Sequence, residues 1–361
     1  MDRAKLTHKD AIELLDLLIA TPSISREEDK TADLICRFMQ TQGIPTYRHF
    51  NNVWAKSLNY DSAKPTLLLN SHHDTVKPSP AYTNPPFQPI HKDGRIYGLG
   101  SNDAGASVVS LITTFCNHYD ANLPFNLILL ISAEEEVTGE HGMRAMLPYF
   151  KQQGINIDMA LVGEPTGLQA AIGERGLVVL DCTAHGKQGH AARNEGVNAI
   201  YKAIDDIQKI QHFQFERTST LLGPIKMTAT MIQAGQQHNV VPDTCSFVVD
   251  IRTTDAYSNE ETVKILQEHL TSDLRPRSTH INASAIDAAH PLVVAAKATG
   301  ADTFVSPTTS DMAVLRGIPS LKLGIGESSR SHSADEFVLE KEIADGIAFY
   351  EKYIENLLLQ L

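Results

Sequence analysis

The chain has 361 residues, of which 42% are hydrophobic and 20% charged, a length at which one hydrophobic core stops growing and two domains are expected. Its net charge of −12 and four scattered cysteines argue against a nucleic-acid partner, an anionic membrane surface, a disulfide framework and a zinc–thiolate site. The charged N-terminus has no apolar core of a signal peptide, and no apolar run reaches the roughly 18 residues that span a bilayer, so we expect a cytoplasmic protein without a membrane partner.

Two helices are expected at the N-terminus. Thr7 precedes an apolar-periodic stretch and has an acidic residue three positions on, and Pro22 ends that helix. Ser25 and Glu28 have the spacing of a capping box before a second periodic stretch, which ends at Gly43.

Strands and helices alternate from about residue 51 to 174, with a helix at 104–119. Short apolar runs that predict strands lie at 66–70, 126–132, 159–163 and 320–324. This rhythm predicts an α/β fold, with a mostly parallel central sheet flanked by helices. Open sheets of this kind bind ligands outside the carboxyl ends of their strands, so polar residues that follow the runs should share one crevice.

The pattern changes near residue 175. Strand-like and helix-like segments then follow in the order β-α-β-β-α-β, at 176–186, 197–213, 224–235, 244–254, 258–272 and 278–286. This is the ferredoxin-like motif. A complete unit between two halves of another sheet indicates an inserted α+β domain. We expect it at 175–286, within a catalytic domain formed by 1–174 and 287–361.

Histidine and carboxylate side chains follow the strand candidates. They are His72, Asp74, Glu134, Glu135, Glu136, Glu164 and His332, with Asp103 in a glycine-rich loop at a helix start. Without thiolates, these ligands suit zinc, cobalt or manganese in a hydrolytic site. Singly, each has a simpler explanation, such as a surface histidine, a solvated acidic turn or an N-cap. Their convergence at the same end of one sheet predicts a metal-dependent hydrolase.

These motifs resemble the zinc aminoacylase and exopeptidase family that includes acetylornithine deacetylase, succinyl-diaminopimelate desuccinylase and glutamate carboxypeptidase. The family motifs H-x-D, an Asp in a Gly-rich loop, D-E-E, G-E-P-T and H-S-x-x-E correspond here to 72–74, Asp103, 134–136, 163–166 and 332–336. The similarity spans the whole chain in order. The family also has a ferredoxin-like lid after G-E-P-T, where the inserted domain is expected.

The resemblance implies two divalent metal ions as cofactors, zinc by preference, with cobalt or manganese as alternatives. One ion would be bound by His72, Asp103 and Glu164, and the other by Asp103, Glu136 and His332. Asp103 would bridge the ions together with a water or hydroxide, whose acidity two dications increase.

Two carboxylates would act beside the ions. Asp74 would accept a hydrogen bond from His72, and Glu135 would take the proton of the water and pass it to the leaving amine. Because Glu134 stands where the family usually has Asp, the register stays open, with Glu134 as base and Glu135 as ligand in the alternative. His73 is also atypical, which leaves open which histidine of the pair is the ligand.

In the inserted domain, the resemblance implies that His190 stabilises the developing oxyanion, commonly from the partner subunit. Asn239 and Arg252 match lid positions that contact the substrate carboxylate in relatives, although a strand-end salt bridge explains Arg252 nearly as well. Gly324 and the loop before His332 would line the opposite wall. Edge strands of such an insert invite pairing between copies, so a homodimer through the lid is expected.

The predicted reaction cleaves a small-molecule N-acyl amino acid to a carboxylate and a free amine. Acetylornithine deacetylation in arginine biosynthesis is the first expectation. Hydrolysis of N-acyl-citrulline, of N-succinylated substrates such as succinyl-diaminopimelate, or of a dipeptide is an alternative, because acyl selectivity lies in a few loop contacts. A binding module without catalysis is a different class, which the retention of every ligand and of Glu135 disfavours.

Overall fold

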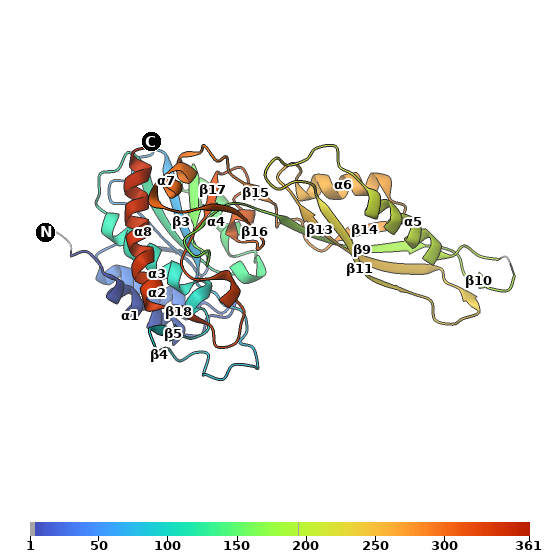
Figure 1. The fold of residues 1–361 in the computed structure, drawn as a ribbon, viewed down its shortest axis with the longest axis horizontal. Coiled ribbons are helices and arrows are strands. Elements are labelled where there is room, and N and C mark those ends of the chain that lie inside the picture. Colours follow the sequence, from blue (N-terminus) through green and yellow to red (C-terminus); the bar gives the residue numbers. More distant parts are fainter. Residues whose placement is uncertain (1–3, 194) are drawn as a thin grey trace. The chain divides into compact units, whose positions relative to one another are not determined.

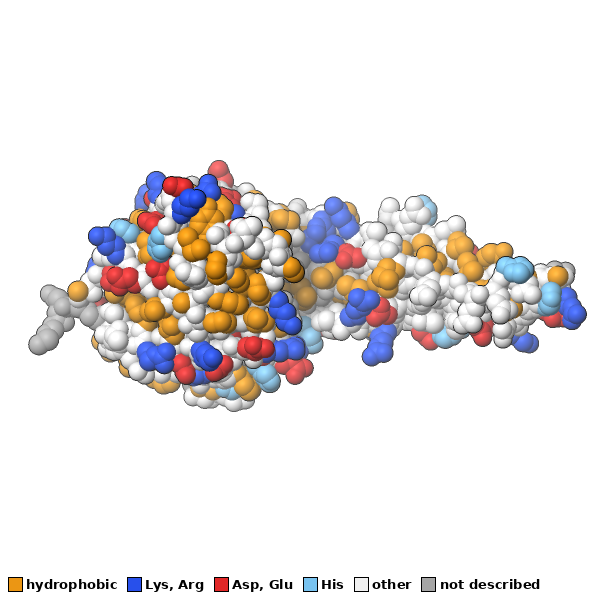
Figure 2. All heavy atoms as spheres, turned by 90° about the horizontal axis from the view of Figure 1, so that it is seen from below, with side chains coloured by type: hydrophobic (Ala, Val, Ile, Leu, Met, Phe, Trp, Pro, Cys, Tyr) orange, Lys and Arg blue, Asp and Glu red, His pale blue; other side chains and the backbone are white. Residues whose placement is uncertain are grey.

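The computed structural model describes residues 4–193 and 195–361, which form two compact units (Figure 1). Unit 1 comprises Met1–Ile172, Ile286–Phe304 and Ser310–Leu361, and unit 2 comprises Gly173–Ala285 and Val305–Thr309. Among the residues described, no helix combines the length and apolar character that a bilayer span requires. On the face seen in Figure 2, acidic and basic side chains are interspersed over both units.

The chain begins with two helices, α1 (His8–Ile19) and α2 (Asp29–Thr41). Thr7 caps α1 through the predicted capping box. The capping box predicted before α2 is wrong, because α2 has no side-chain cap and Glu28 is its N-cap residue. The Ser25 hydroxyl donates instead to the buried carboxylate of Asp74, at 2.7 Å. In a capping box this hydroxyl would accept a backbone N–H of the helix, but here its strong hydrogen bond to a charged acceptor directs it to a distant segment.

The sheet of unit 1 contains β1 (Tyr47–His49), β2 (Asn52–Lys56), β3 (Thr66–His72), β6 (Asn126–Ser132), β7 (Met159–Val162), β8 (Ala170–Glu174) and β17 (Ser320–Lys322). Its order is β1-β2-β6-β3-β7-β17-β8, which β15 (Ser284–Ala285) continues, and β16 (Thr303–Ser306) also pairs with β8. The central strands β6, β3, β7 and β17 are parallel, and antiparallel pairs extend both sides. The predicted α/β fold is thus confirmed. Every residue of β3, β6 and β7 is buried, which explains their continuous apolar runs.

Helices cover both faces of this sheet. They are α3 (Ala106–His118), α4 (Met143–Gln152), α7 (Pro291–Thr299) and α8 (Glu340–Leu358), together with α1. On one face Met146 and Phe150 of α4 pack with Leu68 in a buried cluster. On the other, α3 contacts β3, α1 and α8, and Gly163 lies so close to α3 that a Cβ there would be 2.8 Å from Leu111. A smaller sheet has the order β18 (Phe337–Leu339), β5 (Arg95–Tyr97), β4 (Ile90–Lys92).

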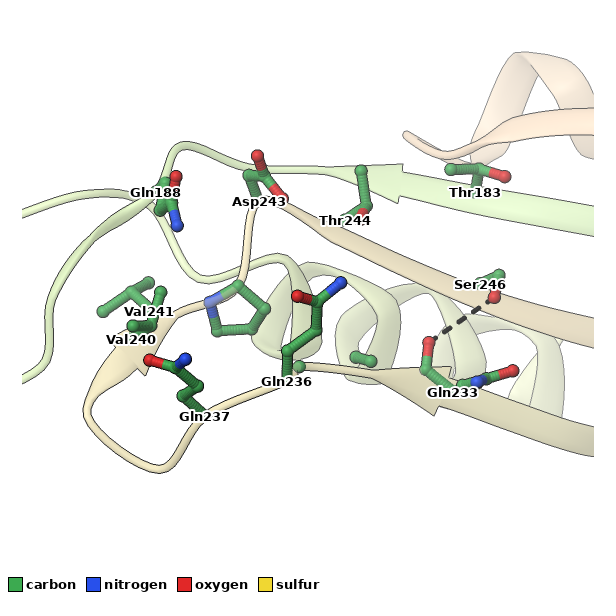
Figure 3. A pocket seen from close by; sticks show the side chains of 13 residues that line it. Thr183, Gln188, Gln233, Gln236, Gln237, Val240, Val241, Asp243, Thr244 and Ser246 are labelled. Carbon is green, nitrogen blue, oxygen red and sulfur yellow. Dashed lines mark hydrogen bonds between the residues drawn. The ribbon is translucent and has the colours of Figure 1, made fainter.

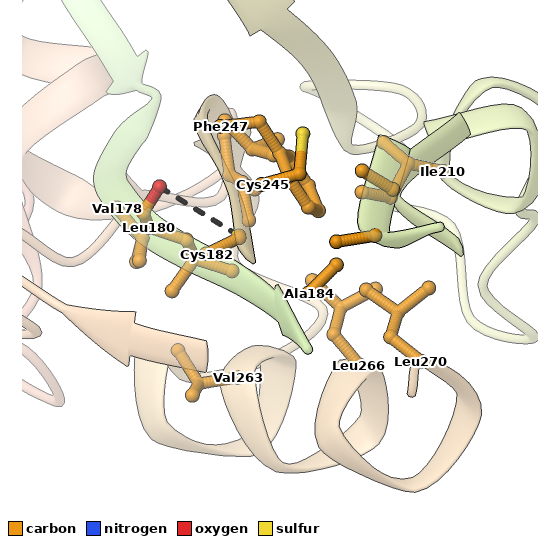
Figure 4. Packing of buried hydrophobic residues seen from close by; sticks show 14 residues of the cluster. Val178, Leu180, Cys182, Ala184, Ile210, Cys245, Phe247, Val263, Leu266 and Leu270 are labelled. Atoms are coloured by element: carbon orange, nitrogen blue, oxygen red, sulfur yellow. Dashed lines mark hydrogen bonds between the residues drawn. The ribbon is translucent and has the colours of Figure 1, made fainter. Parts of the chain in front are cut away.

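Unit 2 has the β-α-β-β-α-β order of a ferredoxin-like domain. Its elements are β9 (Gly176–His185), α5 (Ala199–His212), β11 (Lys226–Ala234), β13 (Thr244–Thr253), α6 (Asn259–His269) and β14 (Asp273–Pro276). The antiparallel sheet has the order β11-β13-β9-β14. Alternate residues of β9 point into one core with residues of β13, α5 and α6, as Val178, Phe247 and Leu266 do in Figure 4. Cys182 and Cys245 lie in this core as small apolar residues.

The last strand of the insert differs from the prediction. We predicted it at 278–286, but β14 is the strand that pairs with β9. Ser284–Ala285 (β15) pairs instead with the last residues of β8. The charged sequence of β14 carries little strand signal because the strand lies at the edge of its sheet, where only one neighbour and one covered face are required.

Candidate metal centre

The carboxyl ends of three adjacent parallel strands bring the predicted ligands together. His72 ends β3, Glu135 and Glu136 follow β6, and Glu164 follows β7. Asp103 lies in the segment Ser101–Gly105, directly before α3, where the backbone is kinked and Asp103 itself is non-helical. His332 comes from the loop between β17 and β18 and reaches the same cluster.

Asp103 lies between the two histidines. Its Oδ1 is 3.3 Å from Nε2 of His72, and its Oδ2 is 3.6 Å from Nε2 of His332. His72 Nε2 is also 3.8 Å from Oε1 of Glu164, and His332 Nε2 is 2.9 Å from Oε2 of Glu136. Each oxygen of one carboxylate therefore faces a different histidine, which is the arrangement that a carboxylate shared by two ions requires.

The donor atoms form two overlapping groups in which all atoms lie within 4.8 Å of one another. One group is His72, Asp103 and Glu136, and the other is His72, Glu135 and Glu164. The second group contains Glu135, which the sequence predicted as the proton acceptor and not as a ligand. The short distances from Glu135 to His72 and Glu164 are compatible with either a ligand or a proton acceptor.

The electrostatics of the cluster fit divalent cations. Burial and the charge of Asp103 raise the pKa of Glu164 to about 8, and burial with the charge of Glu164 raises that of Glu135 well above its ordinary value. The hydrogen bond to Glu136 raises the pKa of His332 to about 9, although partial burial opposes it. The charges of the neighbouring carboxylates repel one another, so the cluster favours bound protons. Metal ions bound by imidazole and carboxylate would replace those protons.

Asp74 forms hydrogen bonds that orient the predicted ligands. His72 Nδ1 donates to the backbone carbonyl of Asp74 at 3.0 Å, whereas the carboxylate Oδ1 is 3.5 Å away. The carboxylate accepts the backbone N–H groups of Glu135 at 3.0 Å and of Glu136 at 3.2 Å. Asp74 therefore orients His72 mainly through its main chain, and its carboxylate fixes the turn that carries the two glutamates.

The side chain of Glu134 points away from the cluster. This residue has a left-handed backbone (φ 56°), and its Oε2 accepts the N–H of His141 at 3.3 Å. A Cβ on Gly139 would lie 1.8 Å from the same oxygen, so only glycine leaves room for this glutamate. Glu135 and Glu136 are thus the members of the triple that reach the cluster, which favours the first register over its alternative.

His73 is also turned away from the cluster. Its Nδ1 is 2.9 Å from the hydroxyl of Thr31, and its Nε2 is 3.0 Å from the carbonyl oxygen of Asn51. Burial lowers the pKa of His73 to about 4, so the ring is neutral in this network. Of the two adjacent histidines, only His72 faces the carboxylates.

Two buried carboxylates near the cluster were missed by the sequence interpretation. Asp311 accepts the hydroxyl of Ser132 at 2.6 Å, and burial raises its pKa to about 6. Glu336 accepts three backbone N–H groups of the Asp103 loop, and burial raises its pKa to about 8. Asp311 has no motif around it that could have revealed it, whereas Glu336 ends the H-S-x-x-E motif and was given no role.

Gly324 lies beside the backbone of Glu164. A Cβ at this position would be 2.4 Å from the carbonyl oxygen of Glu164, so the close approach of the two backbones requires glycine. The N–H of Gly324 donates to the hydroxyl of Thr166 at 3.0 Å. In this structure Gly324 positions the segment that carries Glu164.

The predicted lid residues lie in unit 2. His190 belongs to β10 (Gly189–His190), which pairs with β12 (Val240–Val241), and Asn239 directly precedes β12. The Asn239 carbonyl accepts the N–H of Ala191, so His190 and Asn239 lie on facing segments. Arg252 is separate from them and forms a two-pronged salt bridge with Asp250, at 2.8 and 3.2 Å.

Unit 2 also contains a polar cavity of 690 Å³ beside the Asn239 segment (Figure 3). Four glutamine side chains line it, from Gln188, Gln233, Gln236 and Gln237. The single ionisable residue in its lining is Asp243, so the cavity offers one carboxylate, which is too few for a metal site, and no cation for an anionic ligand.

Comparison with known proteins identifies the family. The chain matches the model of Peptidase family M20/M25/M40 over residues 68–356. The chain belongs to this family. It is a metal-dependent hydrolase of amide bonds, which confirms the family and the enzyme class predicted from the sequence.

The relatives include several succinyl-diaminopimelate desuccinylases. The enzyme of Wolbachia pipientis subsp. Culex pipiens (strain wPip) is 28% identical, with 96% of this chain and 93% of that protein covered. The enzyme of Delftia acidovorans (strain DSM 14801 / SPH-1) is 24% identical, with 96% and 97% covered. Acetylornithine deacetylation, the first expectation, receives no specific support, and the relatives favour the succinylated alternative.

Solved structures share the fold over the whole chain. An aminopeptidase from Bacillus cereus ATCC 10987 has a TM-score of 0.75 at 17% identity, covering 98% of this chain and 99% of its own. A dinuclear metal-binding M20 peptidase from Bacillus subtilis has a TM-score of 0.70 at 17% identity, with 98% and 99% covered. At these identities the likeness establishes the fold alone, an α/β unit together with a ferredoxin-like unit.

Proposed function

We propose that this M20 enzyme is a dinuclear metal-dependent hydrolase that removes the succinyl group from an N-succinyl amino acid, with succinyl-diaminopimelate as the first candidate. The observation that carries the hydrolytic part is Asp103, whose two oxygens face His72 and His332 separately. The names of the relatives support the choice of acyl group. N-acyl-citrulline hydrolysis, acetylornithine deacetylation and dipeptide cleavage are the competing activities.

The proposed ligand sets are those that the family resemblance implies, and the distances between these side chains support them. His72, Asp103 and Glu164 would hold one ion, and Asp103, Glu136 and His332 the other. When bound, two divalent ions supply an acidic water molecule and polarise the carbonyl of the substrate. We propose zinc, because imidazole and carboxylate without thiolate match its preferences, with cobalt or manganese as alternatives.

Glu135 is the proposed proton carrier. Its carboxylate would accept a proton from the water that attacks the amide carbon, and would deliver that proton to the nitrogen as the C–N bond breaks. Burial, the charge of Glu164 and the charge of Asp311 raise the pKa of Glu135, so it holds a proton more firmly than an exposed glutamate does. Asp74 positions this residue through the N–H of Glu135.

Unit 2 would serve as the lid. His190 would donate to the oxygen that becomes negative in the transition state, a contact that accelerates the reaction because it strengthens as charge develops. Asn239 and Arg252 would contact a substrate carboxylate, for which Arg252 must exchange its salt bridge with Asp250.

The state of the cysteines indicates the compartment in which the enzyme works. All four cysteines are free, and three of them are buried. Free thiols fit a reducing compartment, so we propose a cytoplasmic location and a small-molecule substrate.

A substrate panel tests the acyl group. We expect N-succinyl-diaminopimelate to have a kcat/KM at least about tenfold above that of its N-acetyl counterpart. An acetyl group has no carboxylate, so the polar groups that bind the succinyl carboxylate would be left without a partner. The measurement is kcat/KM with added zinc for the N-succinyl and N-acetyl forms of diaminopimelate, ornithine, citrulline and glutamate, together with a dipeptide. Highest activity on acetylornithine or on the dipeptide would contradict the proposal.

We also propose that two copies associate through unit 2. β11 is an edge strand of its sheet, and Met231 and Ile232 on it are 65% and 55% exposed. On α5, Tyr201 is 67% exposed. An edge strand with free backbone groups and large apolar side chains is suited to pairing with the same strand of a second copy.

Mixing two inactive variants tests whether the copies share a site. His190→Ala and Glu135→Gln should each be inactive alone. If His190 acts in the partner's site, a mixed dimer has one site with both groups intact, so statistical exchange should restore up to about a quarter of the parent activity. Activity is measured after exchange, with the double variant as the blank. No recovery despite proven exchange, or a monomer by ultracentrifugation at assay concentration, would refute sharing.

A further inference from the structure

A segment near the C-terminus forms hydrogen bonds with the loop that carries Asp103. The carboxylate of Glu336 accepts the N–H groups of Asn102 and Asp103 on Oε1, both at 2.8 Å, and the N–H of Gly100 on Oε2 at 2.9 Å. Glu336 is only 2% exposed, so water does not compete for these hydrogen bonds. One buried side chain thus pairs three backbone N–H groups of the loop.

The same segment holds the loop at a second point. Oδ1 of Asn102 accepts the N–H of Glu327 at 2.9 Å, and its Nδ2 donates to the carbonyl oxygen of Glu327 at 3.1 Å. A Cβ on Gly326 would lie 2.3 Å from Asn102 Oδ1, so glycine permits this close contact. His332 lies between these two points, so the two residues that hold the Asp103 loop flank a proposed ligand.

Asp103 needs such support because regular helix structure does not hold it. Its backbone (φ −119°, ψ 95°) is non-helical, although α3 begins only three residues later. From this backbone position the short side chain reaches His72 with one oxygen and His332 with the other. The hydrogen bonds that Glu336 accepts from the backbone N–H groups of Asn102 and Asp103 hold the backbone in that position.

We propose that Glu336 is a positioning residue for both metal ions, acting through Asp103. The proposal rests on the metal site proposed above, in which the two ions share Asp103. Because Asp103 is shared, loosening its loop should weaken the binding of both ions together, whereas loss of a ligand to one ion should weaken chiefly that ion. Partners behind metal ligands commonly change metal affinity by 10- to 100-fold.

Asp335 provides a matched control in the same segment. Its carboxylate accepts the N–H groups of Thr83 and Asn84, each at 2.9 Å, and the hydroxyl of Thr83 at 2.5 Å. It therefore anchors a loop with as many hydrogen bonds as Glu336 does, but that loop carries no proposed ligand. A general loosening of the C-terminal segment would affect both variants alike.

The experiment compares Glu336→Gln with Asp335→Asn. In Glu336→Gln, an NH₂ group faces a backbone N–H and cannot accept it, so at least one of the three hydrogen bonds is lost. We expect the zinc dissociation constants of this variant, measured by chelator competition, to rise at least about tenfold for both ions. Asp335→Asn should stay within about twofold of the parent. Thermal unfolding of each apoprotein reports any loss of stability separately.

The outcomes separate this inference from the proposed function. A parent protein that binds no metal would overturn the proposed site and this inference with it. A parent that binds two ions, with Glu336→Gln binding them equally well, would overturn the inference alone, as would equal weakening in Asp335→Asn. Should Glu336→Gln fail to fold, Glu336→Asp keeps the carboxyl group but is too short to reach all three N–H groups, and it should show the same joint loss of affinity.

Discussion

Replacing Glu135 with Gln should lower kcat by about 10²- to 10⁴-fold, the usual contribution of a general acid–base, while both metal ions stay bound. The amide preserves the size of the side chain but cannot accept the proton of the attacking water. The hydrogen bond to Asp74 comes from the backbone N–H of Glu135 and not from its side chain, so the turn should keep its shape. The measurements are kcat on the preferred substrate and metal content by atomic emission.

Glu134→Gln is the matched control for this prediction. It changes the adjacent carboxylate, which points away from the cluster and accepts the N–H of His141, a bond that an amide oxygen also forms. We expect kcat within a few-fold of the parent. Inactivity of Glu134→Gln with an active Glu135→Gln would restore the alternative register. A loss of metal from Glu135→Gln would make Glu135 a ligand, as its place near His72 and Glu164 permits.

Removing the metal ions with a chelator should abolish turnover and leave the far-UV circular dichroism spectrum unchanged. The proposed ligands lie at the ends of strands whose residues are buried in an independent core, so the sheet does not need metal in order to form. Melting should nevertheless shift to lower temperature, because an ion present at about 100 times its dissociation constant adds about 2.7 kcal/mol to the stability of the folded state.

Restoration by added zinc is the control for chelation. Full recovery of activity shows that the chelator removed the ions without damaging the protein. Collapse of the circular dichroism signal would instead mean that metal binding and folding are coupled, as in small zinc domains. Activity that persists after removal of all detectable metal would contradict the metal-dependent mechanism.

Sequence alone determined the elements whose signals are local. The runs of β3, β6 and β7 were predicted because strands buried on both faces need continuous apolar residues, and Thr7 capped α1 as its spacing indicated. Ser25 and β14 show where local signals fail. The Ser25 hydroxyl donates to Asp74, 49 positions away, and β14 is defined by its pairing with β9 and not by its own composition.

The ligand types and their order along the chain were likewise readable from the sequence, since all except Asp103 follow an apolar run and parallel strands end at one edge of a sheet. Only the tertiary structure decided which way each side chain turns. The side chain of Glu134 points away from the cluster because it accepts a hydrogen bond from His141. His73 does so because it is hydrogen-bonded to Thr31 and Asn51. The carboxylates of Asp311 and Glu336 act on residues 179 and 233 positions away. Contacts over such separations leave no periodic trace, because they depend on where the folded backbone places two distant segments.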